Sequence, residues 1–185
     1  IESYVSLNAT PITEMYGLKA IEIIKDALPA AMENPDDVEA RGQMMLASYL
    51  GGVAITAGIG IDHIMAQPLG GTYHIPHGDA CSIFLPASME LNLDHATAKY
   101  ADIARAFGVH DAAKTDRENA LAAIEAVKAL QDKVGSPRSL RPYITGELPS
   151  REVLVDVVKR TTGHITCNPR PLTEDLMWTI FNMVL

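Results

Sequence analysis

The sequence predicts an all-α protein, a multi-helix bundle of about seven to nine helices joined by short connections. Helix start and stop signals recur along the chain, and the apolar residues between them are spaced three or four positions apart. No run of alternating apolar and polar residues makes a convincing strand. No repeat or domain linker interrupts this pattern, so we expect residues 1–185 to form one helical domain.

The first long helix begins at a threonine followed by proline, the residue favoured at the first helical position. These residues are Thr10 and Pro11, and we expect Pro29 to end the helix. Asp36 and Glu39 are spaced as a capping box and predict the start of the next helix.

An uncharged stretch of nineteen residues follows, from Gln43 to Ile61. Its length is close to that of a membrane span, but it contains Ser48, Thr56 and four glycines. We therefore expect no membrane association. The favoured interpretation is a central helix buried on all sides, with Met44 and Met45 in the core.

Glycine and proline then divide the chain between two histidines. Gly70-Gly71 and Pro76 predict a break, after which an apolar helix starts at His77 or Gly78 and continues through Leu91. The alanine-rich stretch from His95 to Phe107 predicts a further helix.

Three more helices are expected in the last third of the chain. Thr115 and Glu118 form a second capping box, whose helix stops at Gly135. Ser150 should cap a helix that ends at Gly163, and Thr173 should cap the last one. That last helix carries an apolar face made of Leu176, Met177, Ile180, Phe181 and Val184.

Charge and cysteine content limit the class of protein. The formal net charge is −8, which argues against a nucleic-acid partner. Cys81 and Cys167 are far apart in the sequence and are typical of reduced thiols in a cytoplasmic protein. The chain starts at Ile1 rather than Met and shows no leader, so we expect it to be part of a longer protein.

His63 and His77 are the candidate metal ligands. Their separation of fourteen positions is too large for neighbours on one helix. It suits one ligand near the end of a helix and another at the start of the next, both facing one ion. Neutral imidazole binds iron, zinc and related ions well, but a catalytic metal needs three or four protein ligands. Further ligands must therefore come from elsewhere.

Several motifs resemble the iron-containing (group III) alcohol dehydrogenases, and together they cover essentially the whole chain. These motifs are Ile1-Glu-Ser-Tyr-Val-Ser6, Ala40-Arg41 through Met44, Ala47-Ser48, Gly58-x-Gly-x-x-His63, Pro68-Leu-Gly-Gly, Tyr73, Ile75-Pro-His77-Gly78, Leu85-Pro86 and Asn168-Pro-Arg170.

The resemblance implies that His63 and His77 are the two histidine ligands of the family's helical C-terminal domain. It implies a preceding Rossmann-like domain, absent from this chain, that binds NAD or NADP. An Asp and a His four residues later, just before Ile1, would complete the site for Fe(2+) or Zn(2+). The intact protein is then expected to interconvert an alcohol and an aldehyde or ketone by hydride transfer, as a homo-oligomer. The isolated chain should be inactive and should hold metal weakly, with help from Asp62, His74 or Asp79.

Gln67 departs from the family pattern. Many members have a histidine four residues after the first ligand, beside the nicotinamide and the substrate. A glutamine can donate and accept hydrogen bonds but cannot titrate. Gln67 is therefore a candidate pocket residue whose effect on proton transfer and substrate choice stays open.

Two alternatives remain at this point. One is the related glycerol dehydrogenase and dehydroquinate synthase branch, which uses zinc and a similar two-domain plan; the intact Ile75-Pro-His77-Gly78 motif favours the alcohol dehydrogenases. The other is a non-catalytic helical module that binds a metal or a partner.

Overall fold

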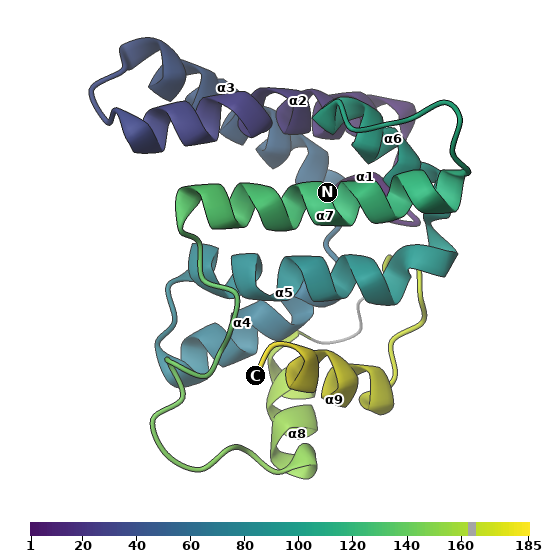
Figure 1. Cartoon of the computed structure of the whole chain (residues 1–185). Helices are drawn as coiled ribbons and strands as arrows, with labels where there is room; N and C mark the ends of the chain where they lie inside the picture. The colour runs from purple at the N-terminus through teal and green to yellow at the C-terminus, as the bar shows by residue number, and fades with distance from the viewer. Residues whose placement is uncertain (163–165) are drawn as a thin grey trace.

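The computed structural model describes residues 1–162 and 166–185, and every regular element in this part of the chain is helical (Figure 1). This confirms the all-α prediction. The α-helices are α1 Glu2–Val5, α2 Pro11–Glu33, α3 Val38–Ala54, α4 Ile61–Tyr73, α5 His77–Asn92, α6 Thr97–Phe107, α7 Asp116–Val134, α8 Arg151–Thr162 and α9 Glu174–Met183. Two 3₁₀ turns, η1 Ile55–Ala57 and η2 Leu93–His95, lie between them.

The helices are arranged in pairs on either side of α5. Figure 1 shows the α2–α3 hairpin at one end of the molecule and α8 with α9 at the other. Helices α6 and α7 pack against each other and against α2, while α4 packs on α5 and α8. Helix α5 therefore contacts both halves of the bundle.

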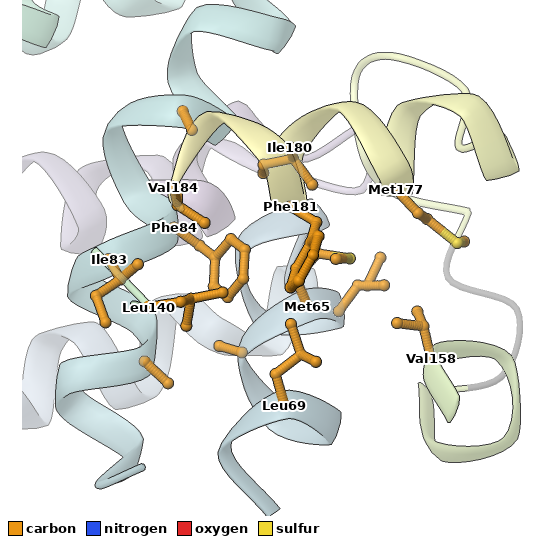
Figure 2. Packing of buried hydrophobic residues seen from close by; sticks show 14 of the residues in the cluster. Met65, Leu69, Ile83, Phe84, Leu140, Val158, Met177, Ile180, Phe181 and Val184 are labelled. Atoms are coloured by element: carbon orange, nitrogen blue, oxygen red, sulfur yellow. The ribbon is translucent and has the colours of Figure 1, made fainter. Parts of the chain in front are cut away.

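Two apolar clusters meet along α5. The first fills the space between α4, α5, α8 and α9, and both Phe84 and Phe181 are fully buried in it (Figure 2). The second joins α1, α2, α6 and α7 around Tyr100 and Ile124, and α5 contributes Met89 to it. The position of α5 in both clusters fixes it firmly, and with it the residues at its start.

Several predicted helix starts are confirmed by capping hydrogen bonds. Thr10, Thr115 and Thr173 each accept a bond from a backbone N–H three residues later. Ser150 accepts from the backbone of Val153 at the start of α8. The predicted end of that helix at Gly163 lies outside the described residues.

Two predicted helix breaks, at Pro29 and at Gly70-Gly71, are wrong. Pro29 does not end α2, which continues to Glu33, because its buried ring is held by packing that offsets one lost backbone hydrogen bond. Gly70 and Gly71 lie inside α4 rather than breaking it. The break comes at His74, which takes the left-handed conformation with φ of 55°.

The interpretation of 43–61 as a fully buried helix is wrong. Helix α3 ends at Ala54, and Gly58, with φ of 94°, turns the chain before α4 begins. Small and apolar side chains such as Ala47 and Leu50 face the bundle, but Met45 is 76% exposed and Met44 is only partly buried. The helix is therefore an outer one. Its N-cap is Asp37, not the predicted Asp36.

Within the described residues, no single helix has the length and apolarity to cross a membrane. The segment Val38–Ala57 passes that test jointly with Ile61–Tyr73, but the two are bent by 107° relative to each other.

Candidate metal centre

His63 and His77 lie next to each other in the structure. Their ring centroids are 5.5 Å apart, and the rings are tilted by 59°. His63 is in the first turn of α4 and His77 is the first residue of α5. The predicted placement of one ligand near a helix end is therefore wrong, since both are at helix starts. The residues 74–76 turn the chain back along α4, and the Ile75 N–H donates to the Gly70 carbonyl at 3.0 Å.

Glu2 holds His63 in place. One carboxylate oxygen, Oε2, is 2.6 Å from Nδ1 of His63, and the other accepts the backbone N–H of Asp62 at 2.9 Å. Glu2 is buried, so this contact is shielded from water. With Nδ1 engaged, Nε2 of His63 is left to face an ion. A carboxylate behind a ligating imidazole is the usual means of fixing its ring orientation.

The start of α4 is capped by side chains from distant parts of the chain. Gly60 provides no capping side chain, and the Ile61 N–H donates instead to Oδ1 of Asn168 at 3.1 Å. A Cβ on Gly60 would lie 2.7 Å from both Asn168 Oδ1 and Glu2 Oε1. Glycine at this position therefore lets the two polar side chains reach the helix terminus.

Cys81 is one helical turn beyond His77. Its Sγ lies 3.7 Å from Nε2 of His77 and 3.9 Å from Nδ1. Burial raises the pKa of the Cys81 thiol to about 12, with further contributions from the charges of Asp62 and Glu2. The thiol is therefore protonated at neutral pH unless an ion displaces its proton.

Of the three polar residues expected to help a weak ion, Asp79 is engaged, His74 is exposed at the helix end, and Asp62 is buried beside His63. Asp79 accepts a hydrogen bond from the Tyr143 hydroxyl at 2.9 Å. His74 is the exposed C-cap of α4. Asp62 is buried, its Oδ1 lacks a hydrogen-bond partner, and burial followed by the charge of Glu2 raises its pKa.

A largely apolar cavity of about 440 Å³ adjoins His63. It is bounded by α2, α3, α5 and α7, and Ile1, Glu2, His63 and Cys81 are among its lining residues. Gln67 is exposed and lies one turn beyond His63, so helical geometry puts both on the same side of α4.

The donor set suits a divalent transition-metal ion. His63, His77 and Cys81 each offer one donor atom within 4.8 Å of the others. Glu2, Asp62 and His63 satisfy the same distance limit, but both carboxylate oxygens of Glu2 are already engaged. Imidazole nitrogen and thiolate sulfur are ligands for zinc, iron and cobalt rather than for magnesium or calcium.

Sequence reasoning missed Glu2, Cys81 and the capping role of Asn168. A signal for Glu2 was present, because a carboxylate stands alone in the otherwise uncharged opening segment of residues 1–6. Asn168 gave no comparable signal, since its partner Ile61 is 107 positions away.

A family model and the most similar curated proteins match this chain in agreement with each other. The model of the Fe-containing alcohol dehydrogenase family, C-terminal region, matches residues 1–185. Lactaldehyde reductase from Escherichia coli (strain K12) is 42% identical over 142 residues, covering 76% of this chain and 37% of that protein. NADPH-dependent butanol dehydrogenase from Clostridium saccharobutylicum is 35% identical over 187 residues, covering 100% of this chain and 47% of that protein.

Solved structures agree with the sequence relatives. The crystal structure of a 1,3-propanediol oxidoreductase superposes with a TM-score of 0.93 at 32% identity, covering 100% of this chain and 48% of that chain. An alcohol dehydrogenase from Oenococcus oeni gives a TM-score of 0.92, also at 32% identity, with the same coverage. The chain thus spans half or less of the length of the relatives it matches.

Proposed function

Because the chain belongs to the iron-containing alcohol dehydrogenase family, we propose that it is the metal-holding half of an NAD(P)-dependent alcohol dehydrogenase. The full-length protein would interconvert a small alcohol with its aldehyde or ketone. The observation that carries this proposal is the pair of imidazoles, His63 and His77, at 5.5 Å between ring centroids.

In this proposal His63 and His77 are metal ligands. Glu2 supports the role of His63, because it occupies Nδ1 and leaves Nε2 available. The chemistry that a bound divalent ion supplies is Lewis-acid polarisation of an alcohol or carbonyl oxygen. The apolar lining of the adjoining cavity would limit the access of bulk water to His63 from that side.

The remaining ligands and the nucleotide site would come from a preceding domain. We propose that an Asp and a His four residues later lie just upstream of Ile1, after a Rossmann-like NAD(P)-binding domain. Two observations support this arrangement. The relatives are at least about twice as long as this chain, and Ile1 lines the cavity that adjoins His63.

Gln67 would face the reacting groups from the same side of α4 as His63. It can orient a substrate hydroxyl or carbonyl by hydrogen bonding, but a proton must leave by another group or by water. We further propose that the protein acts in the cytoplasm as a homo-oligomer. Its two free thiols are consistent with a reducing compartment.

The test is metal content and activity of the full-length protein after dialysis. His63→Ala and His77→Ala should each abolish tight metal binding and alcohol oxidation while circular dichroism still reports a helical fold. His95→Ala, at an exposed histidine in η2, is the matched control and should keep both properties. Tight metal binding by either ligand variant would show that the proposed ligand pair is wrong.

A further inference from the structure

Asn92 and Asn168 form a buried pair of side-chain amides. Nδ2 of Asn92 donates to Oδ1 of Asn168 at 3.1 Å, and Nδ2 of Asn168 donates back to Oδ1 of Asn92 at 2.9 Å. The two residues are only 2% and 4% exposed, so bulk water does not compete for these bonds. The pair therefore joins two segments that are 76 positions apart in the sequence.

Backbone groups determine how the two amides face each other. Oδ1 of Asn168 also accepts the Ile61 N–H at 3.1 Å, and Nδ2 of Asn168 also donates to the Arg170 carbonyl at 2.6 Å. Oδ1 of Asn92 accepts the Arg170 N–H at 3.3 Å. A flipped amide would place two donors or two acceptors opposite each other, so only one arrangement satisfies all of these bonds.

The amide pair connects the two helices that carry the histidines. Asn92 is the last residue of α5, whose first residue is His77. Ile61 is the first residue of α4, which has His63 in its first turn. Through Asn168, the end of α5 is thus joined to the backbone at the start of α4. Because a short turn joins the end of α4 to the start of α5, α4 is held on α5 at both of its ends.

A buried polar pair does more here than fill space. An apolar side chain of similar size could pack at position 92 without the cost of removing an amide from water. The amide pair differs from such a contact because its hydrogen bonds accept only one relative placement of the two segments. This property suits a group that fixes geometry.

We propose that Asn92 is a positioning residue for the metal centre. Acting through Asn168, it fixes the start of α4 on α5 and so holds His63 at the separation from His77 that lets both imidazoles bind one ion. This inference rests on the proposed function, which makes the two histidines ligands. Groups that orient metal ligands typically contribute about ten- to a hundredfold to metal affinity, and we expect about tenfold from Asn92 because it acts through a second side chain.

The experiment compares the Zn(2+) affinity and the melting temperature of the full-length protein and its variants. Asn92→Leu removes the amide and keeps a side chain of similar size. The matched control is Asn119→Leu, because Asn119 is also fully buried and donates to the carbonyls of Asp111 and Thr115 at the start of α7. Both variants should lower the melting temperature, since each leaves buried polar groups without a partner. Only Asn92→Leu should weaken zinc binding, by about tenfold in competition with a chromophoric chelator.

Bound Co(2+) gives a readout of geometry that stability alone does not change. Its visible absorption depends on how the ligands are arranged around the ion. At saturating cobalt, Asn92→Leu should alter that spectrum and Asn119→Leu should not. If either leucine variant fails to fold, Asn92→Asp and Asn119→Asp replace the pair, because each removes only the donor group of the amide.

A double-mutant cycle tests whether Asn92 acts through Asn168. Asn168→Leu should weaken zinc binding more than Asn92→Leu does, because it also removes the bond to the Ile61 N–H. In the Asn168→Leu background, Asn92→Leu should have little further effect. Losses of affinity that add fully would overturn the proposal, since Asn92 would then act independently of Asn168.

The histidine variants separate this proposal from the one on which it rests. If His63→Ala and His77→Ala abolish tight zinc binding while Asn92→Leu binds zinc like the unaltered protein, Asn92 has no positioning role and the histidine pair stands. If His63→Ala and His77→Ala bind zinc as tightly as the unaltered protein, the histidine assignment fails, and this inference fails with it.

Discussion

Glu2 is the residue on which the geometry of His63 depends most directly. Its two oxygens make two different bonds, one to the imidazole and one to the first turn of the helix that carries it. A single buried carboxylate therefore fixes both the ring and its backbone. Loss of that carboxylate should affect metal binding more than it affects folding, because the surrounding helices pack through apolar contacts.

We expect Glu2→Gln to weaken Zn(2+) binding by about tenfold and Glu2→Ala by up to about a hundredfold, the range typical for groups that orient a metal ligand. Glutamine keeps the shape but accepts the imidazole proton less strongly. Competition with a chromophoric chelator measures the change. Glu14→Gln, at a partly exposed glutamate of α2 that pairs with Lys99, is the matched control and should bind as the unaltered chain does. Equal affinities for Glu2→Gln and Glu14→Gln would contradict the positioning role.

The closeness of His63 and His77 was predictable from the sequence, but which part of each helix carries the histidine was not. The glycine and proline residues between them indicated a turn, and the structure has one at 74–76. The position of His63 in the first turn depends on where α4 begins. That start is set by hydrogen bonds that the first backbone N–H groups of α4 donate to Glu2 and Asn168, which no local pattern reveals.

Helix α7 shows how local sequence alone can define an element. The Thr115 hydroxyl accepts the Glu118 N–H, while Glu118 Oε2 accepts the Thr115 N–H at 2.9 Å and its hydroxyl at 2.7 Å. These bonds lower the pKa of the Glu118 carboxyl. Gly135 ends the helix in the left-handed conformation, with φ of 68°.

The capping box should make part of the stability depend on pH. A carboxyl whose pKa is lowered on folding stabilises the protein above its unfolded pKa of roughly 4.3, and this contribution is lost as pH falls through the folded pKa. Glu118→Gln should therefore lower the melting temperature at pH 7, by an amount that shrinks toward zero at acidic pH. Thermal unfolding followed by circular dichroism at both pH values tests this.

A variant without Thr115, the hydrogen-bond partner of Glu118, is the control for that measurement. Thr115→Ala should lower the unfolding free energy by about 1 kcal/mol, as is typical for loss of an N-cap. In that background the effect of Glu118→Gln should be smaller, because the shared hydrogen bonds are gone. An effect of Glu118→Gln that is equal at both pH values would show that the carboxylate charge does not contribute.

Local signals failed where tertiary packing overrides them. Pro29, Pro68 and Pro86 all lie within helices, and all three rings are buried. Each costs one backbone hydrogen bond, but the contacts of a buried ring and of the neighbouring turns keep the helix continuous. The burial of α3 was overestimated because amino-acid composition does not show which face of a helix an apolar side chain occupies. The apolar residues of α3 lie on two faces, one buried and one exposed.

Large apolar side chains are exposed along the outward face of α3. Val38, Met45 and Tyr49 recur at helical spacing along it, with exposed fractions of 83%, 76% and 66%. A row of this kind is commonly covered in an assembly. Because a homo-oligomer is proposed, we expect a second copy of the protein to cover this row.

We expect the chain to associate with itself in a concentration-dependent way and Met45→Glu to weaken this association by about tenfold or more. Burial of a methionine side chain is worth about 1.5 to 3 kcal/mol, and a charge at that position would lose it. Light scattering coupled to size-exclusion chromatography over a wide concentration range measures the change. Val153→Glu, at an exposed position of α8 with an exposed fraction of 54%, should not weaken association. A single monomeric species at every concentration would exclude the α3 face as an interface.

The bond between Asn168 and the start of α4 joins two points separated by 107 positions along the chain. During synthesis on the ribosome, His63 and His77 emerge well before Asn168 does. The two imidazoles can approach each other at that stage, but the first turn of α4 still lacks its cap. If the proposed site binds an ion, we expect it to be loaded only after Asn168 has been made. Chains that end shortly before Asn168 should retain zinc much less well than chains that include it.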